Sequence, residues 1–172
     1  MSPEQAGATA ALARLRGEIA SDRRAMTRRS ADLDEAQRRL GTSPADPAAL
    51  ALEAWAIHGW YTALESLLER VARQLDSEVP TGDRWHRERL AQATVEVPGV
   101  RPAMVPTELR ADLEELLAAR HFLRHAYGLE LDPAKLASQA ARLQTVALPL
   151  ERCLDVFDAF LTKAIDATAA GG

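Results

Sequence analysis

Apolar side chains recur at three- and four-residue steps along most of this 172-residue chain, and this periodicity restricts its fold more than any other feature. It extends over four long segments: residues 12–40, 47–75, 107–128 and 133–167. No stretch alternates apolar and polar residues in the way that a half-buried strand does. The periodicity therefore predicts an all-α protein.

Start and stop signals separate these segments. Asp46-Pro47 and Asp132-Pro133 each put a capping carboxylate before a proline, whose missing N–H costs nothing in the first turn of a helix. The first helix is expected to end near Gly41. Short connectors favour an antiparallel helical bundle.

A single domain over residues 1–172 is predicted, with four long helices and a short one from Arg84 to about Val95. Residues 1–10 and 168–172 are small and polar, and we expect them to be disordered. Pro149 lies inside the last segment and predicts a kink or split near Ala147.

Composition narrows the class of protein. The formal charge is −4, so any RNA site must be a local basic patch. The single cysteine, Cys153, allows no disulfide within the chain. No apolar run approaches the ~20 residues that span a bilayer. The first ten residues lack a signal-peptide pattern, so we expect a cytoplasmic protein.

Basic and aromatic residues also mark possible contact surfaces. Five arginines lie on the outer face of the first helix, but acidic residues interrupt them, which favours a solvated face over an RNA-binding stripe. These arginines are Arg23, Arg24, Arg28, Arg38 and Arg39. Trp55 and Trp60 lie near the edges of the second apolar stripe. An exposed tryptophan can stack on a base, although a core or dimer contact is commoner.

One helix face between the breakers Pro106 and Gly128 carries a charge among apolar residues. Its members are Leu109, Leu113, Leu116, Arg120, Leu123 and Tyr127. An arginine on such a face implies that the face meets an anion or a partner there.

Arg120, His125 and Tyr127 follow the pattern Arg, four residues, His, one residue, Tyr. This pattern resembles the motif of the HEPN superfamily and of its HepT-like ribonuclease toxins, and the helical layout extends the resemblance over about residues 47–167. Many members have asparagine after the motif arginine, where this chain has His121. Histidine can donate a hydrogen bond at that position as well.

The resemblance implies a metal-independent endoribonuclease, the toxin of a toxin–antitoxin pair. Arg120 would hold the scissile phosphate and His125 would be the acid–base group, with His121 and Arg124 supporting the RNA phosphate. On an ideal helix Arg120 and His125 point about 140° apart. The resemblance accounts for this by a homodimer whose two motifs meet across a cleft.

The resemblance also implies partners. Transfer RNA is the expected substrate class, and an MNT-type nucleotidyltransferase antitoxin would silence the toxin by attaching AMP to Tyr127. No cofactor or metal is expected for this chain. His121 and His125 are four residues apart and could bind a metal, but no third ligand is obvious.

Two other interpretations stay open. The first is a non-catalytic module that uses the same cleft to bind a nucleotide or a protein. The second is a structural dimeric bundle in which Arg120 only pairs with a carboxylate such as Glu115 or Asp158.

Overall fold

A computed structural model describes residues 2–76, 80, 85–125 and 131–170, except for the side chains of residues 121–125. The protein is all-α, as predicted, and its described residues form five helices and no strand. These elements are α1 (Pro3–Thr42), α2 (Pro47–Leu75), α3 (Trp85–Ala93), the 3-10 turn η1 (Thr107–Leu109), α4 (Arg110–His125) and α5 (Pro133–Ala170).

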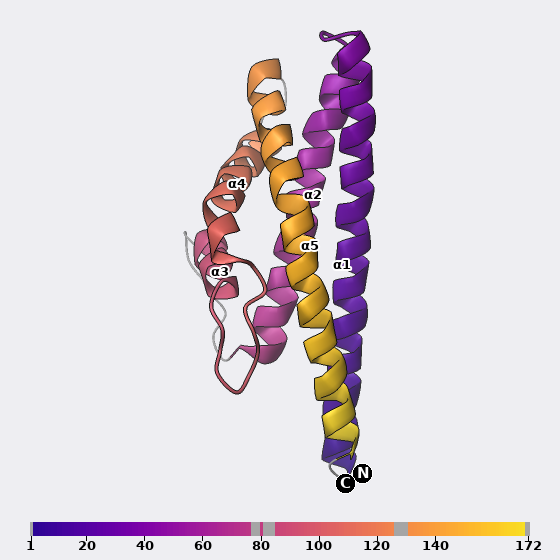
Figure 1. Cartoon of the computed structure of the whole chain (residues 1–172), viewed down its shortest axis with the longest axis vertical. Helices are drawn as coiled ribbons and strands as arrows, with labels where there is room; N and C mark the ends of the chain where they lie inside the picture. The colour runs from indigo at the N-terminus through magenta and orange to yellow at the C-terminus, as the bar shows by residue number, and fades with distance from the viewer. Residues whose placement is uncertain (1, 77–79, 81–84, 126–130, 171–172) are drawn as a thin grey trace.

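The long helices form an antiparallel bundle (Figure 1). α1 and α2 pack along each other, α5 lies beside both, and α4 packs against α2 and α5. The short helix α3 contacts α2 and α4. The predicted apolar stripes supply the core, and its largest fully buried side chains include Trp60, Leu64, Leu113, Leu116 and Phe157. Burying each such side chain stabilises the fold by roughly 1.5–3 kcal/mol before the entropy of ordering is subtracted.

Helix α1 begins at Pro3, inside the segment that the sequence predicted to be disordered. A capping box explains the difference. Gln5 donates its backbone N–H to Ser2 Oγ at 3.2 Å, and Ser2 donates its own N–H to Gln5 Oε1 at 2.7 Å. At the other end of the chain, α5 runs to Ala170, three residues beyond the predicted limit.

Helix α5 passes through Pro149 without dividing, so the predicted split near Ala147 is wrong. The proline ring lies on the exposed side of the helix, whereas its neighbours Val146 and Leu150 are buried. Packing of this buried stripe against the bundle holds the helix together across the one backbone hydrogen bond that proline removes.

The connector between α3 and α4 is anchored by a buried ion pair. Arg101 donates two hydrogen bonds to the carboxylate of Asp76, at 2.7 and 2.8 Å, and further bonds to backbone oxygens of Gln92 and Val95. Asp76 is the C-cap of α2. The pair therefore fixes the connector to the end of α2 and sets where α4 begins.

Candidate functional site

Arg120 lies on α4 and points at α2, away from solvent. Only 8% of the residue is exposed, on the same buried face as Leu113 and Leu116. Its Nη2 is 2.9 Å from Glu65 Oε2, and its Nε donates to Thr62 Oγ1 at 3.1 Å. The anion that the sequence pattern implied is thus Glu65 of α2.

The two carboxylates named in the structural alternative are not the partners of Arg120. Asp158 instead accepts two hydrogen bonds from Arg16, at 2.8 and 2.9 Å. Glu115 is an exposed residue of α4. The pairing with Glu65 could not be read from local spacing, because 55 residues separate it from Arg120.

Glu65 also joins a third helix to the site. Its Oε1 forms an ion pair with Nδ1 of His86, at the start of α3. Only 11% of the Glu65 side chain is exposed, so its charge acts in a poorly screened environment. One carboxylate therefore connects α2 with α3 and α4 at the same point.

The basic and aromatic start of α3 covers this point. The rings of Trp85 and His86 lie with their centroids 3.3 Å apart, and the Arg89 guanidinium is 4.3 Å from the Trp85 ring centroid. Arg89 is itself buried and donates to Glu69 at 3.1 Å. Glu69 follows Glu65 by one turn of α2, so two carboxylates of α2 receive cations from α3 and α4.

The guanidinium of Arg120 keeps one unused donor. Its Nη1 is buried and has no hydrogen-bond acceptor among the described residues. Buried donors of this kind normally have a partner, so this Nη1 is an exception among the buried polar atoms of the site. Phosphate oxygens have the right charge and geometry for a guanidinium.

Two neighbouring groups set the chemistry around this arginine. Thr62 donates its hydroxyl to the backbone oxygen of His58 at 2.8 Å, which leaves its oxygen to accept from Arg120. Burial, with the charge of Glu65 adding to it, raises the pKa of the Tyr61 hydroxyl. Tyr61 therefore stays protonated near neutral pH and is not a base.

Of the predicted site residues, Arg120 is the one whose side chain is described. α4 ends at His125, so the backbones of His121, Arg124 and His125 belong to this helix, but their side chains lie outside the described residues. Tyr127 lies wholly outside them. Sequence reasoning missed Glu65 and Thr62. A usable signal was present, since Glu65 lies between Leu64 and Leu68 on an apolar stripe, where an acidic residue needs a partner.

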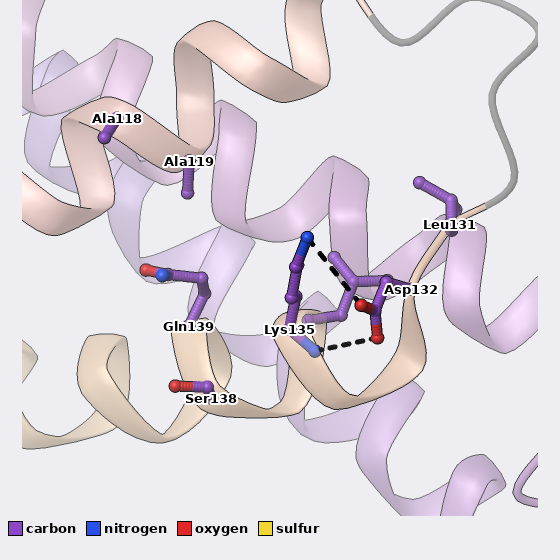
Figure 2. A pocket seen from close by; sticks show the side chains of 8 residues that line it. Ala118, Ala119, Leu131, Asp132, Lys135, Ser138 and Gln139 are labelled. Carbon is purple, nitrogen blue, oxygen red and sulfur yellow. Dashed lines mark hydrogen bonds and ion pairs between the residues drawn. The ribbon is translucent and has the colours of Figure 1, made fainter.

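A hollow of about 290 Å³ lies between α4 and the start of α5. Figure 2 shows Ala118 and Ala119 on one side of it and Asp132, Lys135 and Gln139 on the other. Lys135 donates its backbone N–H to Asp132 Oδ1 at 3.2 Å, and its Nζ is 3.9 Å from Oδ2. Arg120 does not line this hollow, so the hollow is not part of the arginine site.

No group of three or more His, Cys, Asp or Glu side chains among the described residues is arranged to hold a metal ion. In the same part of the chain, no helix has an apolar stretch long enough to cross a membrane.

Comparison with known proteins gives one finding about the family. A family model described as HepT-like protein matches residues 52–161, which run from the first turns of α2 well into α5 and include Glu65, His86 and Arg120. Helix α1 lies outside the match. No curated protein and no solved structure matches the chain.

Proposed function

Because this chain belongs to the HepT-like family of the HEPN superfamily, we propose that it is a metal-independent endoribonuclease, the toxin of a toxin–antitoxin pair. The observation that supports the proposal is the hydrogen bonding of the Arg120 guanidinium. This arginine is held by Glu65 and Thr62, and its buried Nη1 has no acceptor among the described residues. A scissile phosphate is the acceptor that fits it best.

In this reaction the 2′-oxygen of a ribose attacks the adjacent phosphorus, and the bond from phosphorus to the 5′-oxygen breaks. His125 takes the proton of the 2′-hydroxyl, and His125 of a second copy donates a proton to the departing 5′-oxygen. The products are a 2′,3′-cyclic phosphate and a 5′-hydroxyl. Arg120 stabilises the negative charge that grows on the phosphorane.

The family supports the finer parts of the proposal. Transfer RNA is the proposed substrate class, with His121 and Arg124 binding its backbone phosphates. An MNT-type nucleotidyltransferase would attach AMP to Tyr127, seven residues after Arg120 in the chain, and the added negative charge would repel RNA phosphate. A homodimer would bring two motifs together, which would overcome the angle of about 140° that an ideal helix puts between positions 120 and 125.

The test is cleavage of bulk transfer RNA by purified protein in excess EDTA, with wild type beside His125→Ala. We expect cleavage by wild type alone. Cleavage by both proteins would remove His125 from the mechanism. If neither protein cleaves, the intact mass decides: a gain of one or more AMP units at Tyr127 identifies a silenced toxin, and an unmodified mass contradicts the proposal.

The ion pair with Glu65 favours a second candidate, in which Arg120 serves the fold of a non-catalytic binding module. Melting temperature does not separate the candidates, because removing either member of a buried pair destabilises the protein in both cases. His125→Ala separates them. A catalytic His125 loses cleavage while RNA affinity stays close to that of wild type, whereas a binding module shows no cleavage that depends on His125.

A further inference from the structure

Trp55 differs from the other tryptophan of α2 in being open to solvent. It is 57% exposed, whereas Trp60 is 1% exposed. Trp55 precedes Thr62 by seven residues, which corresponds to about 10 Å along the helix and about 20° around it. The indole and the Thr62 hydroxyl that binds Arg120 therefore share one side of α2.

The indole is braced from α1. The guanidinium of Arg29 lies 5.2 Å from the centroid of the Trp55 ring, a cation–π distance, and Arg29 is itself fixed by Asp32 at 2.7 Å. Gly59 makes this arrangement possible. A Cβ at position 59 would lie 2.8 Å from Cδ of Arg29, so glycine leaves the space through which the arginine stem crosses α2.

The arginines on the outer face of α1 differ in their pairing. Of the five arginines on the outer face of α1, three form ion pairs: Arg23 with Glu151 and Asp155, Arg38 with Glu35, and Arg39 with Asp46. Arg24 and Arg28 are exposed and form no ion pair with the described residues. Arg28 is the neighbour of Arg29 in the chain.

The surroundings of Trp55 suit a single flat ligand better than a second protein. Its neighbours on the same side of α2 are His58, Gly59 and Thr62, which are half-buried. Among described residues the other large exposed apolar side chains lie elsewhere, on the connector after α3 and on α5. A protein interface needs an extended apolar centre, whereas stacking needs one accessible ring face.

We propose that Trp55, braced by Arg29, stacks against a base of the RNA strand whose phosphate binds at Arg120. This assignment rests on the proposed function and adds a base-binding subsite to it. The strand would run along α2, with a phosphate at Arg120 and an unpaired base about two helical turns away at Trp55. Such stacking tolerates any base, so it sets where a single-stranded region lies rather than its sequence.

The experiment measures binding of a single-stranded 2′-O-methyl RNA oligonucleotide, which cannot be cleaved because its 2′-oxygen has no proton to lose. We expect Trp55→Ala to weaken binding roughly tenfold and Trp55→Phe to keep most of the affinity. Val156→Ala, which removes another exposed apolar side chain, is the matched control and should bind like wild type. A scan with one abasic site moved along the strand should find a position that weakens wild type but not Trp55→Ala.

Equal affinity of wild type and Trp55→Ala overturns the subsite. A lower molar mass of Trp55→Ala in solution, with unchanged affinity per subunit, overturns it as well and identifies Trp55 as a contact between copies. The proposed function fails separately: oligonucleotide binding that depends on Trp55, without cleavage of transfer RNA, keeps the subsite and rejects the ribonuclease. Absence of any oligonucleotide binding by wild type of unmodified mass rejects the subsite.

Discussion

The carboxylate of Glu65 binds two side chains from two different helices. Nη2 of Arg120 contacts one oxygen and Nδ1 of His86 the other, and little of the side chain is exposed. Without this charge the buried guanidinium would have no anion among the described residues. Glu65 is therefore the residue that makes a buried Arg120 possible and that orients its remaining donor.

Glu65→Gln should lower the free energy of unfolding by about 2–4 kcal/mol, because it leaves the buried charge of Arg120 unpaired. Urea denaturation followed by circular dichroism measures the loss. The matched control is Glu114→Gln on α4, whose side chain is 30% exposed and whose partner Arg110 is 45% exposed, so this pairing should be worth less than about 1 kcal/mol. Equal losses in the two variants would contradict the role given to Glu65.

Glu53 is a second buried carboxyl of α2. Unlike the charge of Glu65, the charge of Glu53 should lower the stability of the fold. Only 2% of the residue is exposed, and Oε2 has no partner among described residues. Burial raises the pKa of the Glu53 carboxyl, and a hydrogen bond with Gln37 opposes this in part. A raised pKa in the folded state means that the fold favours the protonated form. Stability is therefore greatest below the pKa of the unfolded chain and falls as pH rises through the higher folded value.

Glu53→Gln keeps the shape and removes the charge, so it should stabilise the protein by about 1 kcal/mol at pH 7 and have little effect at pH 4. Thermal melts across this pH range measure the difference. Glu96→Gln, at an exposed position on the connector after α3, should leave the curve unchanged. A lower melting temperature of Glu53→Gln at pH 7 would mean that the ionised carboxylate is compensated.

At the scale of elements, periodicity and capping signals were informative enough to predict the helices. The limits of α2 agree with the predicted 47–75, because Asp46 caps its start and Pro47 follows. The predicted motif helix differs at its start, where Thr107–Leu109 form a 3-10 turn before α4. The start of α1 depends on a capping box and the end of α5 on tertiary packing. The helical periodicity of the sequence gives information on neither.

Replacing two glycines by alanine should change the stability of the protein in opposite directions. Gly99 has φ +75° in the turn that brings the connector back to Arg101, and a Cβ there would meet no atom within 4 Å. Gly99→Ala should therefore cost about 1 kcal/mol through backbone strain alone. Gly17 lies within α1 and also has open space around it, so Gly17→Ala should stabilise by about 0.5–1 kcal/mol. Denaturant melts of both variants that shift in the same direction would refute this reading.

At the scale of the whole molecule, the sequence could predict a bundle but not which charges meet across it. Arg16 reaches Asp158, Arg70 reaches Asp22, and Arg120 reaches Glu65, each over 48 or more residues. A row of arginines has the same sequence pattern whether its side chains are solvated or form ion pairs with another helix. Composition therefore could not distinguish the two kinds of helix face. The apolar face containing Arg120 did predict a buried arginine with an anion, because burying an unpaired charge is too costly.

The homodimer of the proposed function predicts complementation between inactive variants. Arg120→Lys keeps the buried charge but loses the guanidinium fork, and His125→Ala removes the acid–base group. If the site combines motifs from two copies, mixing the two variants after co-refolding should restore part of the transfer RNA cleavage. The control is each variant refolded with itself, which should stay inactive. A mixture as inactive as its components would contradict a shared site in which one Arg120 and one His125 from different copies suffice.

The start of α1 and the end of α5 lie next to each other at one end of the bundle, and the turn between α1 and α2 lies at the opposite end (Figure 1). The order of the helices along the chain can therefore be changed while their packing in the bundle is kept. A circular permutant with a short linker from Ala170 to Ser2 and new termini in the connector at residues 43–45 would begin with α2 and carry α1 last. In that molecule the segment matched by the HepT-like family is synthesised first, and α1 is the last helix of the chain. α1 can then be truncated from its free carboxyl end, one helical turn at a time.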